Sequence, residues 1–188
     1  KRVNWSDIDR TWGAGAFEPR FRWDYLRPEE VGLLGAFVQI DGGPVKFTAF
    51  ASPVFIPDRG APLDFSNGRI HSISPWVVNP PYQVKVLNKE TPVRYDAKVP
   101  PLGEIVMQKS LSAQIEVGEG LGPWFSTSYA YQPMNQLLIS YDGGYLLSSG
   151  AVGATLYPRV AYHHLAAADV GYRGQQLAGS LSFLADIP

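Results

Sequence analysis

The sequence predicts an all-β fold of antiparallel strands, and three observations lead to this prediction. First, 19 glycines and 16 prolines are scattered along the 188 residues, so few stretches could hold three uninterrupted helical turns. Second, large side chains alternate with small polar ones over several segments, which is the period of a strand. Third, charge is uneven, with 25 Asp, Glu, Lys and Arg residues in 1–104 and only 8 in 105–188.

The bulk composition excludes several classes of partner and site. We expect a single β domain over 1–188, long enough to bury a sizeable core. A net charge of −1 offers no basic face for a phosphate backbone, so nucleic acid is not an expected partner. The absence of cysteine excludes disulfides and thiolate metal sites.

The start of the chain and its apolar runs bear on location. The chain opens at Lys1 without an initiator Met, so we expect either that a leader has been removed or that it is an interior piece of a longer protein. No apolar run approaches the roughly 18 to 20 residues of a membrane-spanning helix. A location in a membrane would therefore require strands.

The segment 31–52 predicts a β-hairpin. An apolar run over 31–40 is followed by the turn Asp41-Gly42-Gly43-Pro44, and a run rich in aromatic and β-branched residues returns over 45–51. Both the turn chemistry and the strand composition favour this structure.

The segment 53–104 predicts a long, ordered, largely extended loop. It holds nine of the sixteen prolines, which cannot donate to a strand ladder, but its apolar anchors argue against disorder. A short hairpin around 82–87 and 92–97 is compatible with the pattern. An arginine-plus-aromatic surface suits contact with a sugar or a protein, and the candidate contact residues are Arg69, Trp76, Tyr82 and Arg94.

The segment 105–188 predicts an antiparallel meander. Large and small side chains alternate clearly over 111–117, 125–132 and 177–183, and less strictly over 156–173. Glycine-rich turns separate these runs. A soluble sheet normally places Lys and Glu on its outer face, and this segment has almost none to place there.

Two architectures fit such a meander. A soluble β-sandwich or jelly roll points the apolar face inward, whereas a transmembrane barrel points it to lipid and lines its lumen with the polar face. The charge deficit, the aromatic residues near strand ends and the contrast between short turns and one long loop favour the membrane arrangement. The fold prediction is therefore an antiparallel up-and-down β-barrel of the transmembrane type, or part of one, with the soluble β-sandwich or jelly roll as the alternative.

The runs Lys109-Ser-Leu-Ser-Ala-Gln-Ile-Glu-Val117 and Gly122-Pro-Trp-Phe-Ser-Thr-Ser-Tyr-Ala-Tyr131 resemble porin-type Gram-negative outer-membrane barrels, as do 164–172 and 177–183. The resemblance is one of pattern and covers 105–188 and, less closely, 31–52. It implies a place in the bacterial outer membrane. The chain departs from such barrels by ending Phe183-Leu-Ala-Asp-Ile-Pro188 instead of on an aromatic residue, and by offering only about eight to ten strands. We therefore expect it to belong to a longer barrel or to be closed by a partner chain.

No catalytic or metal-binding constellation is evident. Adjacent His163 and His164 point to opposite faces of a strand and cannot chelate one ion together, and no known catalytic or phosphate-binding motif stands in a matching context. We expect no cofactor and no metal. Under the barrel prediction, polar residues lining the lumen would tune passage, although they could equally form a polar network that fills a narrow barrel. These lumen-lining candidates are Gln114, Glu116, Arg159, His163, Asp169 and Arg173.

The functional hypothesis is a non-catalytic outer-membrane barrel with a porin, transport or structural role. Its expected partners are membrane lipid and other protein chains that complete or cap the barrel. The first alternative is a soluble binding or assembly module that is secreted or exposed on a surface. The second is a lipocalin-like barrel that binds an apolar ligand, which requires the large residues of 111–183 to face inward.

Overall fold

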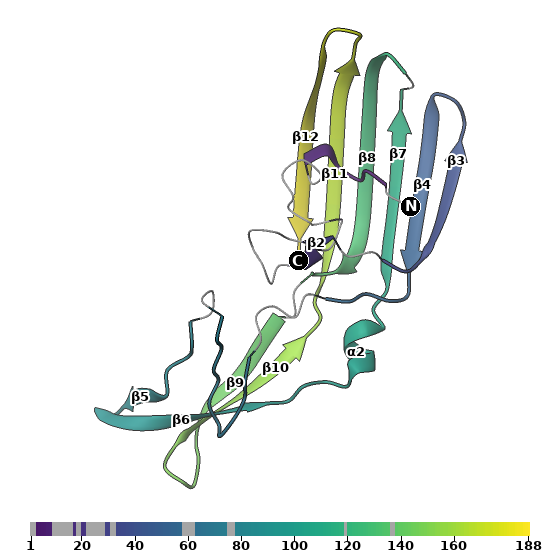
Figure 1. Cartoon of the computed structure of the whole chain (residues 1–188). Coiled ribbons are helices and arrows are strands. Elements are labelled where there is room, and N and C mark those ends of the chain that lie inside the picture. Colours follow the sequence, from purple (N-terminus) through teal and green to yellow (C-terminus); the bar gives the residue numbers. More distant parts are fainter. Residues whose placement is uncertain are drawn as a thin grey trace.

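A computed structural model describes residues 3–8, 17, 20–21, 29–30, 33–57, 63–74, 78–118, 120–135 and 138–188 (Figure 1). These residues are mostly β, which confirms the predicted all-β class, and the largest sheet is curled into a half-barrel. Among them no helix is long and apolar enough to cross a membrane.

Six antiparallel strands form the larger sheet, in the order β12-β11-β8-β7-β4-β3. Their register is continuous from strand to strand, so that Val170 of β11 lies opposite both Phe125 of β8 and Leu181 of β12. Figure 1 shows the six strands side by side. Their bounds are β3 (Ala36–Asp41), β4 (Val45–Ser52), β7 (Ser110–Val117), β8 (Gly122–Pro133), β11 (Tyr162–Arg173) and β12 (Ala178–Ile187).

A second sheet of four strands, in the order β5-β6-β10-β9, lies beyond one end of the larger sheet (Figure 1). Its central pair, β6 and β10, is parallel. A short helix, α2 (Leu102–Val106), leads into β7. Two further strands of two residues each, β1 (Arg20–Phe21) and β2 (Glu29–Glu30), pair antiparallel with each other. The strands of the second sheet are β5 (Gln83–Val86), β6 (Lys89–Ala97), β9 (Leu138–Leu146) and β10 (Val152–Arg159).

This second sheet corrects two details of the predicted organisation. The meander over 105–188 is interrupted, because β9 and β10 leave the larger sheet and β8 pairs with β11 instead. The segment 53–104 was predicted as a loop with a short hairpin around 82–87 and 92–97; β5 and β6 form that hairpin, but β6 also pairs with β10, and the segment contains the start of α2. Pro92 is accommodated because β6 pairs with β10 only from Val93 onward, so one side of Pro92 needs no ladder hydrogen bond.

The connections of the larger sheet differ in length at its two ends. At one end, here called the short-turn end, only a few residues join β3 to β4, β7 to β8 and β11 to β12. Gly118 N–H donates to the carbonyl of Pro44 over 2.8 Å and so links two of these turns. At the opposite end, here called the long-connection end, residues 53–109 and 134–161 make the two excursions that build the second sheet.

Gly118 is required by the turn between β7 and β8. Its φ is +106°, and an added Cβ would lie 2.6 Å from the Pro123 carbonyl oxygen and 2.9 Å from Trp124 Cα. We expect Gly118→Ala to lower the free energy of unfolding by about 1–3 kcal/mol, measured by urea unfolding with tryptophan fluorescence. Gly103→Ala in α2 is the matched control, because nothing lies within 4 Å of the point that an alanine methyl would occupy there, and alanine favours a helix; equal losses in both variants would contradict the argument.

The two faces of the larger sheet are chemically opposite. On the face here called outer, large side chains are exposed, for example Leu181 at 74% and Phe183 at 66%. On the face here called inner, small and polar side chains are buried, for example Ser126 at 4% and Gln132 at 2%. The predicted alternation is therefore present, and the large residues occupy the uncovered face. A lipocalin-like barrel would need these large residues to face inward.

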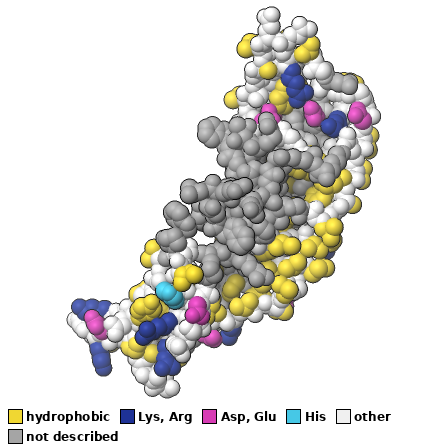
Figure 2. Space-filling model, in the orientation of Figure 1, with side chains coloured by type: hydrophobic (Ala, Val, Ile, Leu, Met, Phe, Trp, Pro, Cys, Tyr) yellow, Lys and Arg dark blue, Asp and Glu magenta, His cyan; other side chains and the backbone are white. Residues whose placement is uncertain are grey.

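The charges of the larger sheet are all on one face. The structure describes every residue of its six strands, and the outward positions of these strands include no Asp, Glu, Lys or Arg. Figure 2 shows charged side chains gathered at the two ends of the molecule and hydrophobic ones along the flank between them. The charged residues of the six strands, all at inward positions, are Asp41, Lys46, Glu116, Asp169, Arg173 and Asp186.

The N-terminal segment Val3–Ile8 covers part of the inner face. Trp5, 7% exposed, lies parallel to Phe17 with ring centroids 6.4 Å apart, and both belong to a cluster with Leu165 of β11. Phe37 of β3 and Leu184 of β12 pack against the same cluster, although they belong to the two edge strands. The sheet therefore curls around the N-terminal segment, which lies in front of it in Figure 1.

Candidate functional site

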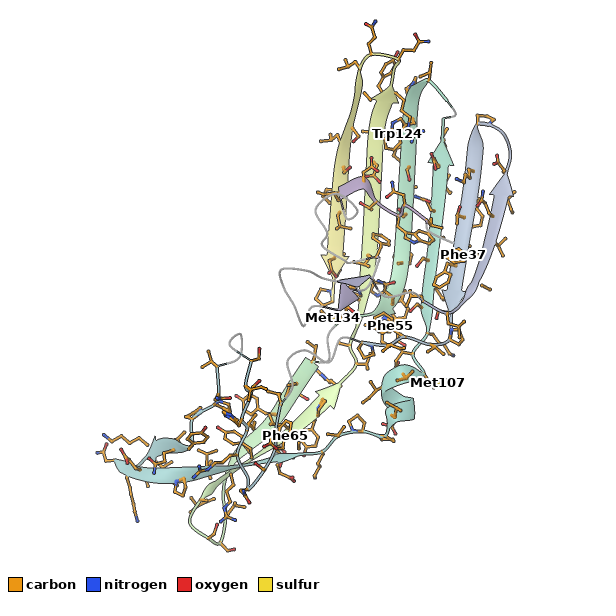
Figure 3. All side chains as sticks on the ribbon, viewed as in Figure 1. Phe37, Phe55, Phe65, Met107, Trp124 and Met134 are labelled. Carbon is orange, nitrogen blue, oxygen red and sulfur yellow. The ribbon has the colours of Figure 1, made fainter. Side chains whose placement is uncertain are left out.

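The candidate site is a polar pocket of about 230 Å³ on the inner face. The N-terminal segment supplies one wall, and five strands of the larger sheet supply the rest. Trp124 marks its position towards the short-turn end of β8 in Figure 3. The lining residues are Val3, Asn4, Asp7, Gln39, Lys46, Thr48, Gln114, Glu116, Trp124, Ser126, Asp169 and Arg173.

On the side of the pocket that the larger sheet supplies, three side chains form an ordered stack. The Arg173 guanidinium carbon lies 4.5 Å from the centroid of the Trp124 ring, and Arg173 Nη2 lies 3.6 Å from Glu116 Oε1. Glycine at 171 makes room for the indole, because a Cβ there would meet Trp124 Nε1 at 2.7 Å. The stack is partly open to solvent, so its ion pair orients the arginine more than it stabilises the fold.

Hydrogen bonds from three strands of the larger sheet help to hold the N-terminal segment on the inner face. Gln114 Nε2 donates to the carbonyl oxygen of Asn4 over 2.6 Å, and Ser128 Oγ donates to the carbonyl oxygen of Trp5. The backbone N–H of Asp7 donates to Asp169 Oδ1 over 3.3 Å. Three strands thus satisfy backbone groups that the segment would otherwise bury unpaired.

Gln114 is the side chain whose loss we expect to loosen this contact. It donates to Asn4 and also to Ser126 Oγ over 3.1 Å, so Gln114→Ala would leave one part-buried and one buried acceptor without their donor. The expected loss in free energy of unfolding is about 1–3 kcal/mol, measured by urea unfolding. Gln83→Ala on the exposed surface of β5 is the control, and a Gln114→Ala protein as stable as this control would contradict the assignment.

The pocket combines both signs of charge in a small volume. Lys46 and Arg173 contribute positive charge, and Asp7, Glu116 and Asp169 contribute carboxylates. Amide and hydroxyl groups fill the space between them, which suits a small polar solute or ordered water. Among the described residues, no group of three or more His, Asp or Glu side chains is placed to hold a metal ion.

Four of the six predicted lumen-lining residues line this single pocket: Gln114, Glu116, Asp169 and Arg173. His163 lies on the same inner face, 4% exposed, with Nδ1 2.7 Å from Asp186 Oδ1. Its buried Nε2 has no hydrogen-bond partner among the described residues. Arg159 is a correction, because it ends β10 in the second sheet and does not lie on this face.

The predicted contact residues of 53–104 lie beside the second sheet. The Arg69 guanidinium carbon is 5.0 Å from the centroid of the Tyr82 ring, and Gly68 brings this turn against Arg94. Trp76 lies outside the described residues. The Tyr95 hydroxyl donates to the carbonyl of Pro81 over 2.9 Å, and burial raises the pKa of this tyrosine.

An aromatic cluster occupies the outer face near the long-connection end. Tyr129 Oη lies 2.6 Å from His164 Nδ1, and the Tyr131 ring lies 4.9 Å from both the His164 and Tyr162 rings. Beside it, a shallow apolar hollow of about 680 Å³ extends over β3, β4 and β7. His163 and His164 therefore face opposite sides of β11, as predicted from their adjacency.

Several pocket residues were not predicted from the sequence. Lys46 could have been found from the pairing of the 45–51 strand with the next one, because its Cα partner is Glu116. Asn4 and Asp7 carry no such signal, since nothing in the sequence predicts that the N-terminal segment folds back onto β7 and β11. Trp124 is one of the aromatic residues near strand ends that favoured the membrane arrangement, but its ring lies on the inner face and Phe125 is the outward residue.

The chain matches no known protein-family model, and searches among curated proteins and among solved structures also found no match.

Proposed function

We propose that the larger sheet is part of the wall of a bacterial outer-membrane β-barrel with a transport or structural role. Its outer face would lie in lipid, and its inner face would line a polar lumen that the N-terminal segment partly fills. The pocket beside Trp124 and Arg173 would be where a passing or bound solute meets the wall.

The distribution of charge carries this proposal. An exposed sheet face in water normally carries charged residues, whereas a face in hydrocarbon excludes them because they are costly to desolvate. The outward positions of the six described strands carry no charged residue, and the inward positions carry all six. This distribution supports the inverted arrangement that a membrane barrel requires.

The dimensions and connections of the sheet support the same proposal. From His164 to Tyr172 the outward positions of β11 extend over about 27 Å, close to the roughly 25 Å apolar band of outer-membrane barrels. Short turns at one end and long excursions at the other match the periplasmic turns and external loops of such barrels. The aromatic cluster around His164 would lie at the membrane interface on the long-connection side.

The soluble alternative has a specific requirement. A β-sandwich or jelly roll would need a second layer packed against the outer face of the larger sheet. The described residues supply no such layer, since the second sheet lies beyond the end of the first. The membrane proposal therefore explains more of the exposed apolar surface.

The test is fractionation of the native protein, followed by electrophoresis of the detergent-extracted material with and without boiling. We expect recovery from the membrane fraction and a band whose mobility changes only after boiling, because a closed barrel resists the gel detergent when unheated. Recovery as a monodisperse protein in plain buffer would overturn the proposal and leave the soluble module as the better hypothesis.

A further inference from the structure

The two edges of the larger sheet carry few of the features that normally prevent a sheet edge from pairing. β3 is bonded only to β4 and β12 only to β11, so neither outer edge is paired with a described strand. Natural sheets protect such edges with Lys, Pro, β-bulges or inward-pointing charges, and each edge strand has one such charge, Asp41 in β3 and Asp186 in β12. Neither edge strand contains Lys, Arg or Pro, and the register of each with its neighbour has no bulge.

We propose that these edges are an interaction surface for a second copy of the chain, with β12 of one copy pairing with β3 of the next to close a barrel. This inference rests on the proposed function, because an open edge in hydrocarbon would leave backbone groups without partners. The repeated unit would be the described half-barrel.

The number of strands makes this closure geometrically simple. The six strands alternate in direction, so β3 and β12 run in opposite senses. A copy rotated about an axis parallel to the strands therefore brings its β3 antiparallel to the β12 of its neighbour. Head-to-tail pairing of this kind closes into a ring when the rotation permits, and the existing half-barrel curl provides rotation in that sense.

The faces of the two edges also match across the proposed seam. β3 presents Val38 and Ile40 outward, and β12 presents Phe183 and Ile187 outward. Pairing the edges would continue the apolar outer band and bring Gln39, which lines the pocket, next to a second inner face. The pocket would then be enclosed by residues of two copies.

The test uses the absence of cysteine from the chain. A Phe183→Cys chain is folded in detergent together with a longer, tagged chain carrying Ala36→Cys, Val38→Cys or Ile40→Cys, and the mixture is oxidised. All four positions are partly or fully exposed, so the substitutions leave the fold intact. The three positions on β3 are successive outward positions, and the Cα atoms of each neighbouring pair are about 7 Å apart. A disulfide spans only about 4.4–6.8 Å between Cα atoms, so we expect only one of the three to react with Phe183→Cys.

We expect one of the three mixtures, at equal amounts of the two chains, to convert about half of the protein into a disulfide-linked product of mixed size that is lost on reduction, because random pairing places about half of the chains in mixed dimers. The position that reacts also gives the stagger of the seam, which barrel closure requires. Ser182→Cys is the control, because its side chain points to the inner face and should give no product with any of the three partners.

The outcomes separate this inference from the proposed function. No mixed product from any pair, in protein whose band shifts on boiling, would overturn the second copy and leave the membrane barrel standing, closed by other strands. A mixed product in protein without the boiling shift would support the pairing and overturn the membrane function. Mixed product together with the shift supports both.

Discussion

Ile115→Arg is expected to lower the free energy of unfolding by about 2–4 kcal/mol when the protein is folded in phospholipid vesicles. Ile115 lies at an outward position of the central strand β7, level with Phe183, and its row is midway along the apolar band of the larger sheet. Under the proposed function its side chain meets the middle of the hydrocarbon, where a guanidinium is costly. The measurement is equilibrium urea unfolding from vesicles, followed by tryptophan fluorescence.

Ile73→Arg is the matched control for this experiment. Ile73 is 86% exposed and lies outside both sheets, so the same change of side chain should alter stability by no more than about 0.5 kcal/mol. If Ile115→Arg behaves like Ile73→Arg, the outer face of the larger sheet meets water, and the proposed membrane location is wrong.

Trp5→Ala is expected to release the N-terminal segment from the inner face. Trp5 is 7% exposed within the cluster that contains Phe17, Ala130 and Leu165, and truncation of a buried tryptophan costs about 3–5 kcal/mol. Ala130 is fully buried in that cluster, so Ala130→Cys reports on release through its reaction with a water-soluble maleimide. A cost of about 3 kcal/mol corresponds to a rise of about a hundredfold in labelling rate.

Val78→Cys is the control for labelling, because Val78 is 94% exposed and lies away from the cluster. Its rate should be the same with Trp5 and with Trp5→Ala. Rapid labelling of Ala130→Cys in the chain that retains Trp5 would show that the N-terminal segment does not cover this part of the inner face in solution.

The larger sheet was predictable from the sequence because large and small side chains alternate in most of its strands. The pattern over 111–117 and 125–132 predicts both the strands and their faces, and the glycine-rich turns between the runs indicate hairpins. The second sheet was less accessible. β6 meets β10 across more than fifty residues of chain, and the period of each strand carries no information about a partner that far away.

The candidate site was predictable only where it belongs to these alternating strands. Glu116, Asp169 and Arg173 were placed on the polar face by period two alone, and the structure brings them to one pocket. Arg159 follows the same pattern but belongs to a strand that leaves the larger sheet, so alternation without pairing assigned it to the wrong surface. Asn4 and Asp7 depend on a tertiary contact of the N-terminal segment, for which local sequence carries no signal.

The parallel pairing of β6 with β10 has a consequence for the order of folding. The first four strands of the larger sheet form two hairpins, β3–β4 and β7–β8, and the excursion over 53–109, which contains β6, separates them. The second sheet can form only once β10 is available to pair with β6. β11 can reach β8 only after the second excursion, over 134–161, has been made. Since closing long loops is slow relative to forming hairpins, we expect the first four strands to order early and β11 and β12 to dock in a later kinetic phase. During that interval, the free edge of β8 is the part of the nascent sheet most open to mispairing.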